Sequence, residues 1–196
     1  MKSFIHLAPA SAAHIEAVIH YALGDCALGR VLVAMSEHGV CALSLGDDSA
    51  ALIGELRSRF PGAGLTHGGA ECERCVAKAV NFVEMTSLAL DLPLDVRGTD
   101  FQQRVWQALR KIPCGARASY TEIAQQIGSP KAVRAVAGAC AANTLAVAIP
   151  CHRAVRADGG LAGYRWGIPR KAELLRRECE TREAMRGRLP TAIALA

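Results

Sequence analysis

The chain has 196 residues, of which 51% are hydrophobic and 21% charged, with a formal net charge of +5. This composition is typical of a folded globular protein and argues against disorder. No apolar run approaches the roughly 20 residues that cross a bilayer, so no membrane partner is expected. His6 and Pro9 interrupt the apolar start of the chain, which predicts a cytoplasmic protein rather than a secreted one.

The charges are unevenly distributed along the chain. Residues 1–96 hold 6 Lys and Arg against 11 Asp and Glu, whereas residues 97–196 hold 17 against 7. A strongly basic second half indicates a polyanionic partner such as nucleic acid, and a solvated basic face without a partner is the alternative. Eight cysteines without a secretory signal predict reduced thiols rather than a disulfide framework.

The first half has the pattern of an α/β domain. Apolar or β-branched runs predict strands over residues 15–23, 31–35 and 40–45, separated by turns at Gly24-Asp25 and at residues 37–39. Apolar residues at helical spacing predict helices over 47–60 and 71–85. An extended connector over 90–96 then leads to a domain boundary near Arg97-Gly98, where the sign of the charge changes.

The second half is predicted to be mostly helical. Thr99, with Gln102 three residues later, forms a capping box for a helix that ends before Pro113. Trp106 lies on the apolar side of this helix and is expected in the core rather than in a functional site.

A helix-turn-helix is predicted to follow. Ser119 and Glu122 form a second capping box, and Gly128 ends the short helix that begins there. Ser129 then caps another helix, of which Pro130 is the first residue. Two short helices joined by such a turn make the motif.

The second helix of this pair has one stripe for packing and one exposed face. The packing stripe holds Val133, Val136, Ala137 and Cys140. The exposed face carries one long cation among small neighbours: Lys131, Arg134, Ala135, Gly138 and Ala141. Such a face holds little that reads bases in the major groove but suits close contact in a narrow groove, with Arg134 as the probe. A helix-packing surface of small residues is the alternative.

The strongest chemical signal is Pro150-Cys151-His152-Arg153. The histidine and the arginines at 153 and 156 form a field that favours the thiolate, which is the nucleophilic form of cysteine. A buried structural cysteine is the alternative, although such cysteines are rarely set among cations. His152 can serve Cys151 only if the backbone turns sharply or a water molecule bridges the two side chains.

Two distant residues and one loop are expected to complete this site. Asn143 can brace the turn through its amide, and Glu178, on a helix predicted over 169–180, can hold His152 in the required tautomer. The glycine-rich loop at 158–167 carries two aromatic residues, a composition typical of a wall over a pocket for a flat ligand such as a base.

Together these motifs resemble the methylated-DNA–protein-cysteine methyltransferases, the O6-alkylguanine-DNA alkyltransferases. The resemblance is carried in order by Ser119-Tyr120, residues 130–136, Asn143, residues 150–153, Gly163-Tyr164 and the helix from Arg170 to Glu178. It is dense from Thr99 to Glu178 and thinner across the first half. Within the family, the chain is most similar to the alkyltransferase half of bacterial adaptive-response proteins.

The resemblance implies an α+β fold in three parts. Residues 1–96 would form an α/β structural domain of the ribonuclease H-like type, residues 97–180 a helix-turn-helix alkyltransferase domain, and residues 181–196 a tail. A chain of this length has no room for the additional amino-terminal zinc and DNA-binding module of adaptive-response regulators. Regulation of transcription is therefore not expected.

The implied function is DNA repair. The protein would flip O6-alkylguanine, and also O4-alkylthymine, out of duplex DNA and transfer the alkyl group irreversibly to its own Cys151 in one turnover. A protein that binds alkylated DNA without removing the alkyl group is the main alternative. A cysteine hydrolase, active without DNA, and a sequence-selective transcription factor are two others.

The resemblance also implies roles for the catalytic residues. Cys151 accepts the alkyl group, and His152 deprotonates it through a water molecule while Glu178 orients His152. Asn143 supports the turn, and Tyr120 donates a hydrogen bond to the guanine as its oxygen becomes a leaving group.

Binding roles follow in the same way. Arg134 replaces the flipped base in the helix stack, and the surface that contacts the minor groove comprises Ser119, Lys131, Ala132, Arg134, Ala135 and Gly138. The pocket for the base and its alkyl group comprises Pro150, Val155, Gly163, Tyr164 and Arg165. No cofactor or metal is expected, since the Cys72 and Cys75 pair lies on a predicted helix without a second pair. A monomer associated with the nucleoid is implied.

Overall fold

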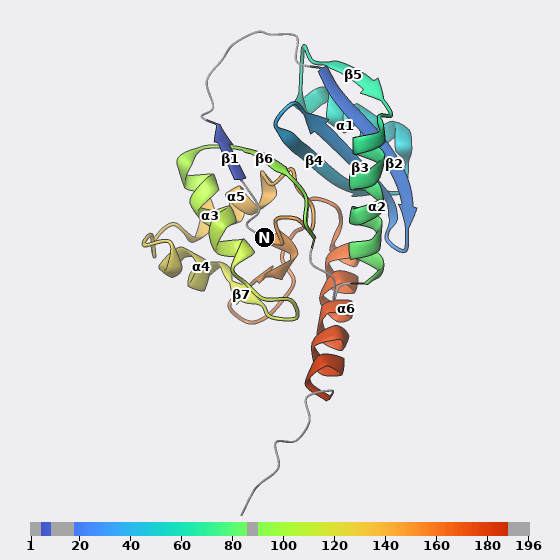
Figure 1. Ribbon diagram of the computed structural model, residues 1–196. Coiled ribbons are helices and arrows are strands. Elements are labelled where there is room, and N and C mark those ends of the chain that lie inside the picture. The colour runs from blue at the N-terminus through green and yellow to red at the C-terminus, as the bar shows by residue number, and fades with distance from the viewer. Residues whose placement is uncertain (1–4, 9–17, 86–89, 188–196) are drawn as a thin grey trace, which may run out of the picture.

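A computed structural model of the protein describes residues 5–8, 18–85 and 90–187 (Figure 1). Within these residues a mixed six-stranded sheet is accompanied by six α-helices, which confirms the predicted α+β class. None of the described helices has the length and apolar character of a membrane span.

The sheet has the strand order β1-β6-β4-β3-β2-β5. Its strands are β1 (Ile5–Ala8), β2 (Val18–Cys26), β3 (Gly29–Ser36), β4 (Gly39–Gly46), β5 (Gly64–His67) and β6 (Leu94–Arg97). Strands β2, β3 and β4 form an antiparallel meander, whereas β1 and β5 join their neighbours in parallel. Strand β6 contacts β4 through the pair Val40 and Leu94.

Two helices cover the opposite faces of this meander (Figure 1). Helix α1 (Ser49–Arg59) packs against Leu32 and Ala34, while α2 (Ala70–Glu84) packs against the alternate residues Val31 and Val33. Successive side chains of a strand point to opposite faces, so a strand covered on both sides is apolar throughout. This explains why the central strands show no polar alternation in the sequence.

The predicted strands are found, but one turn is misplaced. The turn at Glu37-His38 is confirmed, whereas Gly24 lies inside β2 and pairs with Val31. Helix α2 passes so close to Gly24 that a Cβ there would meet Val76 at 2.6 Å, which explains a glycine within a strand. The hairpin instead turns at residues 27–28, and Gly29 supplies the positive φ of 98°. Residues 15–17 of the first predicted strand lie outside the described residues.

The second half contains α3 (Asp100–Arg110), β7 (Ala118–Ser119), α4 (Tyr120–Gln126), α5 (Val133–Ala141), the 3₁₀ turn η1 (Cys151–Arg153), β8 (Ala154–Val155) and α6 (Ile168–Gly187). Both predicted capping boxes are confirmed, at Thr99 with Gln102 and at Ser119 with Glu122. Trp106 is buried as predicted, and its Nε1 donates to the carbonyl oxygen of Ala139 at 2.9 Å, which joins α3 to α5.

Two helix boundaries differ from the predictions. Helix α5 begins at Val133 rather than Pro130, because the amide of Ala132 bonds the carbonyl oxygen of Ser129 and closes a turn there. Helix α6 continues to Gly187 instead of ending at Glu180, so the predicted tail begins inside a helix. Residues 188–196 lie outside the described residues.

The two halves share one apolar core and are joined by backbone contacts. Leu43 of β4 donates to the carbonyl oxygen of Thr144 at 2.9 Å and accepts from the amide of Ala146 at 2.8 Å, so Leu43 and Leu145 form a parallel bridge. Val147 follows with φ of 56°, a left-handed conformation that costs a β-branched residue about 1–3 kcal/mol. The segment that leads to Cys151 is therefore held in a strained shape against the first half.

Candidate active site

A short parallel strand pair brings two distant segments together. Ser119 of β7 pairs with Val155 of β8, and so Tyr120 and Cys151 line the same cavity. The cavity has a volume of about 390 Å³ and is lined by Tyr120, Ala137, Cys140, Ala141, Cys151, Ala162, Gly163, Tyr164 and Arg165. The site thus combines the start of α4, one side of α5, the 3₁₀ turn and the glycine-rich loop.

This cavity brings together the predicted loop residues but not two predicted flanking residues. Gly163, Tyr164 and Arg165 line the cavity as predicted. Pro150 and Val155 are buried but are not among its lining residues, because Val155 is engaged with Ser119 in the strand pair. The wall contributed by α5 was missed, although its residues 137, 140 and 141 recur at helical spacing.

Asn143 braces the turn that carries the thiol, as predicted. It is fully buried, and its Nδ2 donates to the carbonyl oxygen of Ile149 at 2.9 Å and to Sγ of Cys151 at 3.2 Å. Its Oδ1 accepts from the amide of Leu145 at 2.9 Å. The residues 151–153 form a single 3₁₀ turn, which supplies the sharp bend that the adjacent Cys151 and His152 require.

His152, Arg153 and Glu178 form a buried cluster behind the thiol. His152 Nε2 lies 2.8 Å from Glu178 Oε1, and both side chains are fully buried. Arg153 donates from Nη2 to the same oxygen at 2.8 Å and from Nε to Oε2 at 3.0 Å. The amide of Gly115 also donates to Oε2, at 3.2 Å. The predicted partnership of His152 and Glu178 is present, and Arg153 is a third member that the sequence did not reveal.

The acid–base properties of this cluster suit a neutral histidine. Burial lowers the pKa of His152 below its ordinary value and outweighs the opposing effect of Glu178. Burial disfavours the charged form of Glu178, yet the hydrogen bonds from His152 and Arg153 prevail and lower its pKa to about 2. With Nε2 donating to the carboxylate, Nδ1 of His152 is a free acceptor, and it has no hydrogen-bond partner in the described part of the chain.

Cations do act on Cys151 as expected, but they are not the predicted ones, and burial outweighs them. Burial raises the pKa of the Cys151 thiol to about 11, although Asn143, Lys171 and Arg165 act in the opposite direction. Arg153 does not help the thiol because its guanidinium is engaged by Glu178, and Arg156 is exposed. The thiol is therefore neutral at rest and needs a base when substrate arrives.

Lys171 is a further charged residue of the site that the sequence analysis missed. It is fully buried on α6, and its Nζ donates to the carbonyl oxygen of Ala154 at 2.5 Å, just beyond the 3₁₀ turn. Burial lowers the pKa of Lys171, while the thiols of Cys151 and Cys140 act against that shift. Lys171 stands seven residues before Glu178, two helical turns along the same face, which is the signal that could have found it.

Tyr120 and the exposed face of α5 lie as the sequence predicted. Burial raises the pKa of Tyr120 to about 12, so its hydroxyl keeps its proton at neutral pH. The exposed residues are Lys131, Arg134, Ala135, Gly138 and Ala141, and Ala132 is half-buried beside them. Ser119 does not belong to this face, because it is buried and its hydroxyl is engaged with Glu122 in the capping box.

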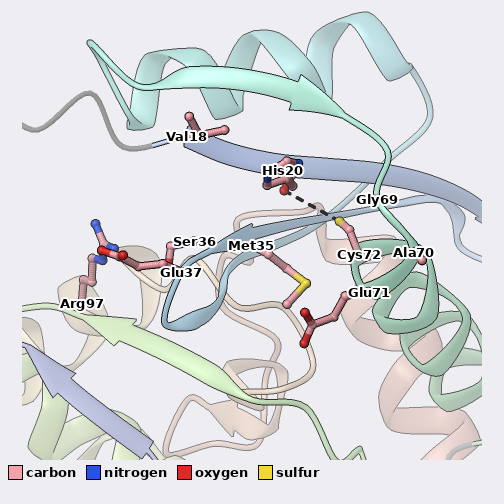
Figure 2. A pocket seen from close by; sticks show the side chains of 10 residues that line it. All are labelled: Val18, His20, Met35, Ser36, Glu37, Gly69, Ala70, Glu71, Cys72 and Arg97. Atoms are coloured by element: carbon pink, nitrogen blue, oxygen red, sulfur yellow. Dashed lines mark hydrogen bonds between the residues drawn. The ribbon is translucent and has the colours of Figure 1, made fainter.

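A larger cavity of about 590 Å³ lies elsewhere, where β2 and β3 meet the start of α2 (Figure 2). It is lined by Val18, His20, Met35, Ser36, Glu37, Gly69, Ala70, Glu71, Cys72 and Arg97, and includes none of the predicted site residues. Cys72 donates from Sγ to the backbone carbonyl oxygens of Val33 and His20, as Figure 2 shows for His20. All eight cysteines are among the described residues, and none forms a disulfide.

Comparisons with known proteins agree with this site. A family model described as "6-O-methylguanine DNA methyltransferase, DNA binding domain" matches residues 100–180. The chain is 58% identical over 165 residues to the "Bifunctional transcriptional activator/DNA repair enzyme Ada" of Escherichia coli (strain K12), covering 84% of this chain and 47% of that protein. It is 57% identical over 88 residues to a "Methylated-DNA--protein-cysteine methyltransferase" of Mycobacterium bovis, covering 45% of this chain and 53% of that protein. The chain thus spans about half the length of these curated relatives.

A solved structure extends the similarity over nearly the whole fold. The crystal structure of Mycobacterium tuberculosis OGT in complex with DNA superposes with a TM-score of 0.71 at 37% identity, covering 83% of this chain and 94% of that one. The similarity therefore includes the sheet of the first half as well as the site. This chain belongs to the family of O6-methylguanine-DNA methyltransferases, the methylated-DNA–protein-cysteine methyltransferases.

Proposed function

We propose that this protein repairs duplex DNA by transferring the alkyl group of O6-alkylguanine to Sγ of Cys151. The observation that carries the proposal is a buried thiol, 3% exposed, that lines a cavity and is backed by an Asn143 brace and a His152–Glu178 pair. A relative that is 57% identical over 88 residues is named a "Methylated-DNA--protein-cysteine methyltransferase".

The depth of the thiol favours extrusion of the damaged base. A base that stays stacked in the duplex cannot reach a sulfur at this depth, so it must rotate into the cavity, at a cost of a few kcal/mol. Helices α4 and α5 act as a helix-turn-helix whose small-residue face enters the minor groove. Arg134, exposed on that face, occupies the space that the base leaves.

Transfer is a displacement at the alkyl carbon. The Cys151 proton passes through a water molecule to Nδ1 of His152, whose other nitrogen is held by Glu178. The thiolate then forms the carbon–sulfur bond as the carbon–oxygen bond breaks. The electron pair of the broken bond stays on the guanine oxygen. Tyr120, which keeps its proton, donates a hydrogen bond to that leaving group.

The product thioether is stable, and no residue of the cavity offers a step that would regenerate the thiol. Each molecule therefore acts once, and O4-alkylthymine is a second substrate of the same chemistry. No cofactor takes part. The first half is a ribonuclease H-like structural domain, and the protein acts as a monomer in the cytoplasm, on the nucleoid.

The test is mass spectrometry of the protein after incubation with duplex DNA that contains O6-methylguanine. The expected result is a gain of one CH₂, from S–H to S–CH₃, on the peptide with Cys151 and none in the Cys151→Ser variant. Binding without a mass gain would instead identify a non-catalytic alkylated-DNA-binding protein. Repeating the experiment with ethyl, benzyl and O4-methylthymine substrates defines the range of groups accepted.

A further inference from the structure

Arg153 makes four hydrogen bonds within the buried cluster, and the proposed reaction gives it no role. It is 8% exposed and reaches both oxygens of Glu178, with Nε at 3.1 Å from Oε1 and 3.0 Å from Oε2 and Nη2 at 2.8 Å from Oε1. Its Nη1 donates to the carbonyl oxygen of Ile112 at 2.5 Å. The guanidinium is thus fixed to the carboxylate that also holds His152.

The charges around His152 disfavour its protonated form. Glu178 is the one carboxylate in this cluster of described residues, and its single negative charge faces the permanent positive charge of Arg153. Lys171, on the same helix α6, adds a second cation. The remaining ionisable neighbours are neutral at rest: Cys151 on the 3₁₀ turn, Cys114 near Glu178, and Tyr164, whose ring centroid lies 6.4 Å from that of His152.

We propose that Arg153 is a positioning residue that keeps His152 neutral, because it claims the negative charge of Glu178 that would otherwise stabilise an imidazolium. This proposal rests on the proposed function, in which His152 must accept a proton at Nδ1. A buried carboxylate with no other cation draws a proton onto a histidine at hydrogen-bond distance. Arg153 prevents this protonation, so the only effect of Glu178 on the ring of His152 is to orient it.

Removing Arg153 therefore alters the base without touching the thiol or the brace. In Arg153→Met the charge of Glu178 is shared with His152 alone, and the imidazole takes up a proton near neutral pH. The protonated ring has no acceptor at Nδ1, so it cannot take the proton of Cys151. The acid limb of the transfer rate moves to higher pH, while the rate at alkaline pH is largely recovered.

The primary experiment is an NMR titration of His152 in the full chain, with ¹⁵N-labelled histidine and the signal assigned by comparison with His152→Gln. In the native protein we expect Nδ1 to stay unprotonated through pH 6. An ordinary histidine titration centred near pH 6.5 would overturn the proposal, and this measurement needs no variant to fold.

The variants separate charge from packing. In Arg153→Met the midpoint should rise by one pH unit or more, and adding Glu178→Gln should reverse that rise. Arg153→Lys keeps the charge but loses the fork of hydrogen bonds, so its midpoint should stay close to that of the native protein. If the lysine variant shifts as far as the methionine variant, the role of Arg153 is structural and the proposal is wrong.

Arg176→Met is the matched control, since it removes an exposed Arg–Glu pair from the same helix and should leave His152 unchanged. The pH profile of alkyl transfer gives the second readout. A one-unit shift of the acid limb lowers the rate tenfold at a pH below that limb. Equal loss at every pH would contradict the proposal. If the titrations behave as expected but no alkyl group is ever transferred, the proposed function fails while the role of Arg153 stands.

Discussion

The amide nitrogen of Asn143 lies 3.2 Å from Sγ of Cys151 and 2.9 Å from the carbonyl oxygen of Ile149. One buried side chain therefore fixes the backbone before the reactive turn and donates to the sulfur within it. A hydrogen bond to sulfur favours the thiolate, so Asn143 also opposes the effect of burial on the thiol. Shape and reactivity at Cys151 depend on the same amide group.

Asn143→Ala should reduce both stability and transfer. It removes the side-chain partner of the Leu145 amide and one of the two donors to the carbonyl oxygen of Ile149, which keeps the amide of Cys151. The cost should be about 1–3 kcal/mol in the free energy of unfolding. Urea unfolding and single-turnover transfer rates measure the two effects. Asn81→Ala, at an exposed position of α2, is the control and should change neither.

Lys171→Met should make the thiol harder to ionise without unfolding the protein. Lys171 lowers the pKa of Cys151 against burial, so its loss raises a pKa that already stands at about 11. Reaction of the Cys151 peptide with iodoacetamide at pH 8 should slow about tenfold for each unit of that rise. Methionine removes the donor to the carbonyl oxygen of Ala154 but also removes the cost of burying a charge, and the two effects oppose each other. An unchanged alkylation rate, with Lys78→Met as the exposed control, would exclude the electrostatic role.

Glu178 should dominate the loss of stability in acid. Its pKa is lowered to about 2 in the folded protein, so its stabilising contribution is complete above pH 4.5 and disappears as the pH falls toward 2. The shift corresponds to about 3 kcal/mol. In Glu178→Gln, the unfolding free energy should be lower at neutral pH and flatter between pH 4.5 and 2.

Glu173→Gln serves as the matched control for that experiment. Glu173 has a similarly low pKa but lies on the outer face of α6, where salt screens its pairs with Arg176 and Arg177. Its acid profile should therefore depend on salt concentration more than that of Glu178. If the acid profiles of the two variants change alike with salt concentration, the buried cluster contributes no more to stability in acid than the outer pairs do.

Arg134→Ala should slow repair of duplex DNA more than transfer from free O6-benzylguanine. The side chain is exposed on α5 and does not line the cavity, so a free base meets the same thiol in the variant. Without the Arg134 side chain in the gap that the extruded base leaves, extrusion costs more free energy. This raises the barrier for transfer from duplex DNA but not for transfer from the free base. Equal losses on both substrates would remove this role.

Gly138→Leu should impair DNA binding while the fold remains intact. A Cβ at Gly138 would meet no atom within 4 Å, and a leucine raises helix propensity by roughly 0.5–1 kcal/mol. The larger side chain stands on the face that we propose approaches DNA, so affinity for duplex should fall. Gly54→Leu on α1, where a Cβ is equally unobstructed, is the control and should bind normally.

The sequence predicted most accurately what depends on local interactions. The capping boxes at Thr99 and Ser119 and the exposed face of α5 involve residues within two helical turns of one another, so spacing alone specifies them. The residues alone made Glu178 only a candidate partner of His152, and the family resemblance gave the pair its roles, because nothing local joins two residues that far apart. The structure places them 2.8 Å apart.

The errors at Arg153, Gly24 and Lys171 share one physical cause, which is tertiary burial. Arg153 looks in the sequence like a cation beside the thiol, but Glu178 takes its charge and burial reverses the expected shift of Cys151. Gly24 looks like a turn residue because the close approach of α2 is not visible in the sequence. Lys171 has the pattern of an ordinary surface lysine of a helix.

The bridge between Leu43 and Leu145, with the strained Val147 beside it, ties the reactivity of the sulfur to the integrity of a sheet that touches no substrate. Warming that loosens strand β4 would let the strained backbone at Val147 relax, and the turn that carries Cys151 would change its shape. Loss of repair capacity should therefore precede loss of helical circular dichroism on heating. A sheet far from the lesion would then set the temperature range in which the molecule can work.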